Sequence, residues 1–184
     1  MRFVLRAVLA FAAAVGMAVT AAAQEMPPLP TPGPEHDVLK MDVGTWDAVV
    51  ELKAPDGSTT TSKGVETNTL GCEGLCLISD YKGELMPGMS FSGHGVTTYD
   101  KAKKKYVGSW TDSMSTGLAV SEATYDPATK QATATMEGPD MNGTVTKTKA
   151  VSEHKGPDQR VMTMYSLAGG GEAEVMKITY TRRK

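Results

Sequence analysis

The residues best able to do chemistry are a histidine flanked by glycines and a large set of methionines. His94 stands between Gly93 and Gly95, which let another group approach the backbone and can expose the imidazole. The sequence holds 12 methionines, and Met86 and Met89 lie close to His94. Thioethers with an imidazole can bind Cu(I), and an imidazole can ligate heme iron. One hypothesis is therefore a periplasmic heme- or copper-binding protein that uses His94 with methionine or cysteine ligands.

Spacing argues against a shared copper site. Met89 and His94 are an odd number of residues apart on one expected strand, which places their side chains on opposite faces. Methionine also fills adaptable cores and pockets, and a histidine in solvent or in a hydrogen bond needs no ligand. We therefore predict no bound metal and no cofactor, and keep the heme or copper protein as an alternative.

A second alternative is a barrel enzyme that uses Asp112 and Glu122. Trp110 and Asp112 share one face of an expected strand, as Leu118 and Glu122 do on the next. Carboxylates that project into one cavity can do acid–base work if burial separates their pKa values. Solvated carboxylates at strand ends are the competing interpretation. The sequence has no nucleophile elbow, phosphate loop, dinucleotide fingerprint or zinc-protease motif, so it predicts no catalytic residue.

Cys72 and Cys76 are the only cysteines. In an exported protein two cysteines suggest a disulfide, and Gly71 and Gly74 give the backbone freedom to bring them together. Separate thiols, or a metal or redox role, are the alternatives. The Cys-x₃-Cys spacing lacks the second ligand pair of a strong zinc signature. We predict a Cys72–Cys76 disulfide that fixes local geometry.

Alternating residues on several expected strands form a mixed apolar and polar face. On the last strand, Met176, Tyr180 and Arg182 share one face, and Met162 and Met164 share a face on the strand before it. We predict that these faces point to the inside. Such a wall suits a small lipophilic molecule with one polar end, and a filled core is the competing explanation. The predicted ligand-binding residues are Trp46, His94, Trp110, Met114, Met162, Met164, Met176, Tyr180 and Arg182.

Composition and turn signals predict an all-β fold that positions these residues. Threonine and glycine are abundant, and they favour strands and tight turns respectively. Turn sequences such as Ala54-Pro55-Asp56-Gly57 interrupt the chain at short intervals. The ten expected strands cover residues 43–52, 58–70, 75–85, 89–99, 105–113, 118–125, 130–137, 144–154, 159–167 and 172–183.

Short connections make neighbouring strands antiparallel. One open sheet of ten strands would leave two exposed edges, so we predict an up-and-down β-barrel of about ten strands. A short helix at residues 35–41 precedes it. The alternative is a two-sheet sandwich, and pairing of the first strand with the last would exclude it. A barrel of this size is wide enough for an internal cavity.

Residues 1–23 are typical of a secretory signal peptide. Arg2 and Arg6 precede an uncharged, alanine-rich stretch that ends at Ala21-Ala22-Ala23. The alternative is a membrane anchor, but the stretch is at the short limit for a spanning helix. Residues 24–34 are proline-rich and predict an extended tether, and residues 35–184 predict a single β-barrel domain. We expect an exported protein, periplasmic or extracellular, with no integral membrane segment after cleavage.

Charge narrows the choice of partner. The formal net charge of the whole chain is −2, and loss of Arg2 and Arg6 with the leader would make it about −4. No basic face is apparent, which argues against nucleic acid. The function we predict is a non-enzymatic exported barrel that binds a small hydrophobic or amphipathic molecule.

Two motifs resemble those of the calycin group, which includes lipocalins, fatty-acid-binding proteins and nitrobindins. Gly44-Thr45-Trp46 opens the first expected strand, and Arg182 and Arg183 end the last. Calycin barrels open with Gly-x-Trp and carry a basic residue near the end of the last strand. The resemblance implies an indole that closes one barrel end, with a guanidinium stacked on its face and bonded to nearby carbonyls.

A longer resemblance covers roughly residues 35–183. The sequence is similar to the bacterial family catalogued as domain of unknown function 1579. The resemblance implies a family with no established activity, so it transfers no catalytic residues, and the two cysteines are not part of it. The similar stretches are Glu35 to Trp46, Phe91 to Gly95, Thr98 to Asp100, Lys104 to Met114, Tyr125 to Thr129 and Ile178 to Arg182.

Overall fold

The chain enters the fold through a short helical segment. The structure, a computed structural model, describes residues 28–184, so the predicted signal peptide and the start of the tether lie outside the described residues. A 3-10 turn at Pro34–His36 (η1) runs into α1 at Asp37–Lys40. The predicted helix at 35–41 is thus confirmed. No helix in the described part of the chain is long and apolar enough to cross a membrane.

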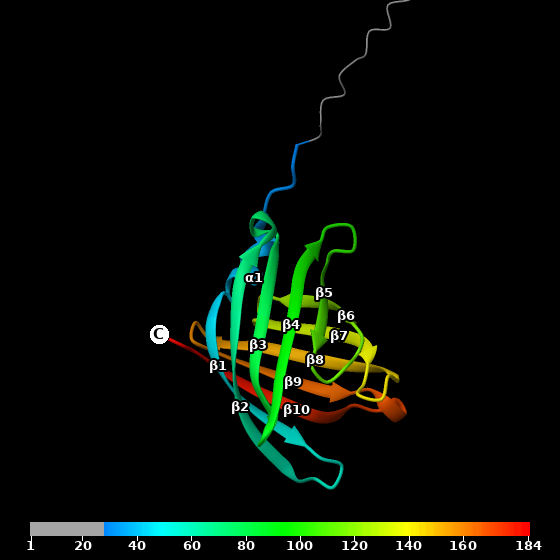
Figure 1. Cartoon of the computed structure of the whole chain (residues 1–184). Coiled ribbons are helices and arrows are strands. Elements are labelled where there is room, and N and C mark those ends of the chain that lie inside the picture. Colours follow the sequence, from blue (N-terminus) through cyan, green and yellow to red (C-terminus); the bar gives the residue numbers. More distant parts are fainter. Residues whose placement is uncertain (1–27) are drawn as a thin grey trace, which may run out of the picture. The chain divides into compact units, whose positions relative to one another are not determined.

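Ten antiparallel strands then close into a barrel (Figure 1). Each strand pairs with its neighbour in the chain, and the last strand pairs with the first, from Trp46 with Arg182 to Leu52 with Met176. That closing pair excludes the sandwich and confirms the predicted barrel. The strands are β1 Gly44–Lys53, β2 Thr59–Gly71, β3 Cys76–Met86, β4 Met89–Asp100, β5 Lys105–Asp112, β6 Ala119–Asp126, β7 Gln131–Pro139, β8 Val145–Gly156, β9 Gln159–Ser166 and β10 Ala173–Arg182.

The connections use the expected turn chemistry. Between β7 and β8 the Asp140 carboxylate accepts hydrogen bonds from the backbone N–H groups of Asn142, at 2.8 Å, and Thr144, at 2.9 Å. Gly143 in the same turn has a φ of 81°, a conformation that glycine adopts without steric cost. These bonds hold the two strands in register.

One end of the barrel is covered by the segment that precedes β1, and we call it the capped end. His36 and Leu39 are buried there. The Tyr106 hydroxyl donates a hydrogen bond of 2.8 Å to the Glu35 carbonyl, and the His36 ring packs edge-on against Tyr99. The helical segment is therefore anchored to β4 and β5 by specific contacts.

The opposite end, which we call the distal end, carries several exposed apolar side chains. It holds the β1–β2, β3–β4, β5–β6, β7–β8 and β9–β10 connections. The turns between strands at the capped end are charged or polar instead, for example at residues 100–104 and 126–130. The exposed large apolar residues in or beside the distal connections are Met86, Met89, Leu118, Met141 and Val145.

Candidate functional site

Trp46 closes the capped end of the barrel. Its side chain is completely buried, and its indole N–H donates a hydrogen bond of 2.8 Å to the Asp42 carbonyl. The Arg182 guanidinium lies 4.1 Å from the centre of the indole ring. Arg182 also donates to the carbonyls of Val43, Met41 and, at 3.0 Å, Pro157. This is the arrangement that the calycin resemblance implied: a stacked guanidinium that also satisfies nearby carbonyls.

A buried ionic cluster lies beside Trp46. Arg160 on β9 is 6% exposed and pairs with the equally buried Glu66 of β2. Its guanidinium carbon is 3.9 Å from the centre of the Tyr180 ring and 5.1 Å from that of Trp46, and its Nε is 3.3 Å from Asp42 Oδ1. Buried charges are stable only when paired, and here one cation faces two carboxylates.

The ionic cluster shifts the pKa values of its members. Burial alone would raise the pKa of Asp42, but Arg160, the hydrogen bond to His154 and the charge of Arg182 hold it below its ordinary value. The carboxylate and the His154 ring are 3.0 Å apart. Burial, followed by the neighbouring Glu66, raises the pKa of Tyr180 far above its usual range. Asp42 therefore remains ionised and Tyr180 neutral at any physiological pH.

Large side chains fill the barrel along β10, β1 and β3. Tyr81 lies across Gly64 of β2, a position where any Cβ would collide with its ring, and packs edge-on against Phe91. The tyrosine hydroxyl is buried without a hydrogen-bond partner among the described residues. We call the buried apolar core the filled wall, formed by Trp46, Ala48, Val50, Tyr81, Ile178 and Tyr180.

The inner faces of β6, β7 and β8 are built differently. Ala123, Ala134 and Ala150 form a row across the three strands, and small polar residues flank it. Each of these residues stays partly exposed, although its side chain takes an inner position in the strand register. Solvent therefore reaches this part of the interior. We call it the hollow wall: Ala119, Ser121, Ala123, Ala132, Ala134, Met136, Thr148, Ala150 and Ser152.

Methionines and Trp110 lie where the two walls meet. Met162 and Met164 on β9 and Met176 on β10 face the inside and are partly exposed. Trp110 on β5 packs over Gly93 and Gly95. A Cβ built on Gly95 would stand only 2.8 Å from the indole Cε3 atom, so a larger residue would not fit there. The group that approaches the backbone beside His94, which the sequence suggested, is thus this indole.

Asp112 organises the distal end of β5. Its carboxylate accepts hydrogen bonds from the Trp110 indole N–H, at 3.0 Å, and from the backbone N–H of Met114, at 2.9 Å. It holds the half-buried Met114 at the start of the β5–β6 loop. A carboxylate with two fixed donors serves to position Trp110 and the loop.

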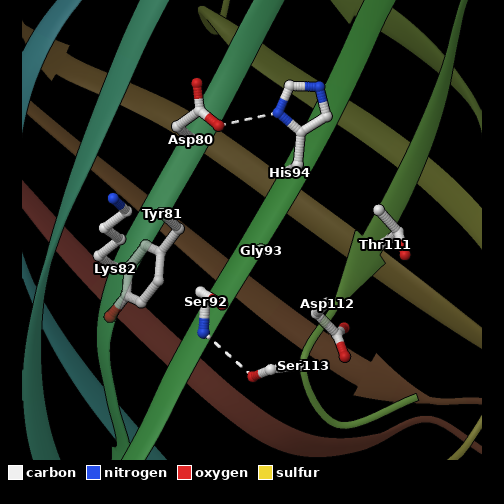
Figure 2. Close-up of a pocket in the computed structure, with 9 residues that line it drawn as sticks. All are labelled: Asp80, Tyr81, Lys82, Ser92, Gly93, His94, Thr111, Asp112 and Ser113. Atoms are coloured by element: carbon white, nitrogen blue, oxygen red, sulfur yellow. Dashed lines mark hydrogen bonds and ion pairs between the residues drawn. The ribbon is translucent and has the colours of Figure 1, made fainter. Parts of the chain in front are cut away.

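His94 lies outside the barrel. Its imidazole is 51% exposed and makes a 2.8 Å hydrogen bond to the Asp80 carboxylate. The pair lines a shallow depression of about 420 Å³, together with Lys82 and Thr111. Figure 2 shows the Asp80–His94 hydrogen bond and these neighbours. Of the predicted ligand-binding residues, His94 alone is separated from the interior by the barrel wall.

Asp112 and Glu122 do not meet. Glu122 faces outward, because it pairs with Val107 and Thr135 on the outer side of the sheet. Its hydrogen bonds to Lys103 and Lys105, each 2.7 Å, lower its pKa to about 2. The structure therefore gives no shared cavity in which these two carboxylates do acid–base work.

The expected disulfide is present between Cys72 and Cys76, which span the short 3-10 turn η2 (Cys72–Gly74) between β2 and β3. Cys76 is buried and Cys72 is exposed. Within residues 28–184, no three histidine, cysteine, aspartate or glutamate side chains group closely enough to hold a metal ion.

Sequence reasoning missed the ionic cluster. Arg160 shares its strand face with Met162, which was assigned to the interior, so alternation would have placed a guanidinium inside. Glu66 likewise faces inward because it pairs with Trp46. Alternation along each strand could therefore have placed both charges inside the barrel. It could not have paired them, because the partner of each charge depends on the register between strands.

The closed ten-strand barrel, short N-terminal helix and Trp46–Arg182 stack define a calycin-type, lipocalin-like barrel. Within that class, the chain belongs to the family described as "Protein of unknown function (DUF1579)", which matches residues 31–182. No curated protein matches the sequence.

Several solved structures are similar in fold, and they include the following two. The first is Rv2717c from M. tuberculosis, with 11% identity and a TM-score of 0.64 over 83% of this chain and 99% of that one. The second is the S-type phycobiliprotein lyase CPES from Guillardia theta, with 14% identity and a TM-score of 0.56 over 82% of this chain and 93% of that one. At these identities the likeness extends to the fold alone.

Proposed function

We propose that the protein is exported and binds one small hydrophobic or amphipathic molecule inside its barrel, without transforming it. The observation that carries this proposal is the hollow wall. Ala123, Ala134 and Ala150 face the interior in register but remain partly exposed to solvent. A partly exposed inner surface of small side chains is what a ligand of this kind would cover.

The residues around the hollow wall suit an apolar ligand. Met162, Met164 and Met176 present thioethers, which adapt to the shape of a bound molecule. Trp110 offers an indole whose N–H is already bonded to Asp112, so its ring is left for apolar contact. The exposed apolar side chains of the distal end would give such a ligand a favourable path to the interior.

Export is supported by two features. Residues 1–23 are typical of a secretory leader, and the Cys72–Cys76 disulfide is compatible with an oxidising compartment. The heme or copper alternative receives no such support, because the barrel wall separates His94 from the methionines inside. The barrel-enzyme alternative loses its carboxylate pair in the same way.

Native mass spectrometry of the protein isolated from its own host tests this function. We expect a mass that lacks residues 1–23, contains one disulfide, and carries one additional small molecule that organic solvent extracts. A protein that retains the leader would contradict export. A protein that is free of ligand, and takes up no apolar probe when one is supplied, would contradict the binding function.

A further inference from the structure

A notch lined by two hydroxyl groups interrupts the inner wall between β4 and β6. Thr97, Gly108 and Ser121 lie side by side in register on these three strands. A Cβ built on Gly108 would stand 2.9 Å from Ser121 Oγ and 3.1 Å from Thr97 Oγ1. The glycine therefore leaves a space that both hydroxyls border, and all three residues are partly exposed.

The two hydroxyls are free to bind a ligand. Neither forms a hydrogen bond with another residue in the described part of the chain, whereas Thr98, on the outer face, donates to the Leu75 carbonyl at 2.7 Å. A hydroxyl can donate one hydrogen bond and accept two, and it rotates to suit its partner. An oxygen atom placed over Gly108 would lie between two adjustable groups.

The arginines on the inner wall are already engaged. Arg160 faces Glu66 and Asp42, and Arg182 is bonded to backbone carbonyls. No strand lysine faces inward among residues 44–182, because each takes an outer position in its strand register. An ionised ligand group would therefore be desolvated without an opposite charge to pair with, which is strongly unfavourable.

We propose that the Thr97–Gly108–Ser121 notch binds the single uncharged oxygen of the ligand, a hydroxyl or a carbonyl, and that the barrel selects neutral lipophilic alcohols or ketones over carboxylates. This inference rests on the proposed binding function. The hollow wall and the methionines would contact the apolar part of the same molecule, since Ser121 belongs to both the notch and the hollow wall.

The test uses the exported form of the protein and three probes at pH 8. Diphenylhexatriene, a fluorescent hydrocarbon, reports occupancy of the interior, and 1-decanol and decanoate compete for it with the same chain length. We expect 1-decanol to displace the dye at a concentration at least tenfold below that of decanoate, because only decanoate buries a charge.

Variants locate the effect. Thr97→Val and Ser121→Ala each remove one hydroxyl with little change in volume. Each is expected to weaken the binding of 1-decanol about three- to tenfold, the value of one hydrogen bond, and to weaken it more than the binding of the dye. Gly108→Ala fills the notch and should weaken 1-decanol at least as much. Ser109→Ala, on the outer face of the same strand, is the control and should change neither.

Failure of the notch and failure of the proposed binding function give different results. If the wild-type protein takes up no diphenylhexatriene, the binding function and the notch both fail. If the dye binds but decanoate competes as well as 1-decanol, or if Thr97→Val and Ser121→Ala leave 1-decanol unaffected, the binding function stands and the notch is overturned.

Discussion

The filled wall and the hollow wall belong to one closed sheet but differ in the size and packing of their inner side chains. The filled wall holds Trp46, Tyr81 and Tyr180, which pack against each other and against a paired guanidinium. Apart from Met136, the hollow wall holds alanine, serine and threonine at its inner positions, and these residues are partly exposed to solvent. The same backbone pairing supports both, so the difference comes from side-chain volume alone.

This division separates stability from binding. Burial of large apolar side chains is the main favourable term in folding, and the filled wall supplies it. Small side chains on the hollow wall give up part of that term and leave inner surface uncovered. The capped end, with Trp46 and Arg182, lies on the filled side, so the structural motif of the calycin class serves the fold rather than the ligand.

The largest expected effect is on the filled wall. Trp46→Ala removes a fully buried indole, the ring on which Arg182 stacks and one of the two rings that Arg160 contacts. We therefore expect a loss of about 3–5 kcal/mol in the free energy of unfolding. Met136→Ala on the hollow wall should cost about 1 kcal/mol, because its side chain is only partly buried. Urea denaturation measures both, and equal losses would abolish the comparison.

The ionic cluster gives the next largest effect. Glu66→Gln leaves the buried Arg160 guanidinium short of one counter-charge, and we expect a loss of about 3 kcal/mol. The matched control is Glu122→Gln on the outer face, whose lysine partners are solvated, and its stability should be nearly unchanged. A small effect of Glu66→Gln would mean that solvent reaches the filled wall too.

A smaller effect is expected on the pH dependence of stability, through Asp42 of the ionic cluster. The pKa of Asp42 is held below its ordinary value of 3.8, so its contribution to stability is complete above that pH and disappears as the pH falls through the lowered folded value. Asp42→Asn has no such contribution. Denaturation of both proteins between pH 5 and 2 should show that the wild-type advantage shrinks with acidification, and a constant or growing advantage would contradict this assignment.

Much of this architecture can be predicted from the sequence. Alternating residues and turn signals placed all ten strands within two residues of their observed bounds, because hairpin turns and alternation are local properties. Gly44-Thr45-Trp46 and Arg182 indicated the closed end correctly. Met162, Met164, Met176 and Tyr180 were rightly assigned to the inside, since alternation along one strand decides it.

What the sequence does not reveal depends on register between strands. Asp112 and Glu122 follow alternation on their own strands, but only the pairing of Trp110 with Ala119 shows that their faces are opposite. His94 carries the chemistry of a ligand-binding group and still faces solvent. The hollow wall itself was overlooked, because alanine and serine carry no signal until register places them together.

The proposed binding site can be closed at one position. Ala134→Phe would project a ring from the centre of the hollow wall into the interior, and Thr133→Phe, its neighbour on the outer face, is the matched control. Circular dichroism and urea denaturation would establish that both variants are folded before binding is compared.

The affinity of diphenylhexatriene for these two variants and for the wild type tests the role of the hollow wall directly. We predict at least a tenfold loss of affinity for Ala134→Phe and no change for Thr133→Phe, because only the first occupies the space beside Ala123 and Ala150. Equal affinity of Ala134→Phe and wild type, or an equal loss in both variants, would contradict the claim that the hollow wall is the binding site.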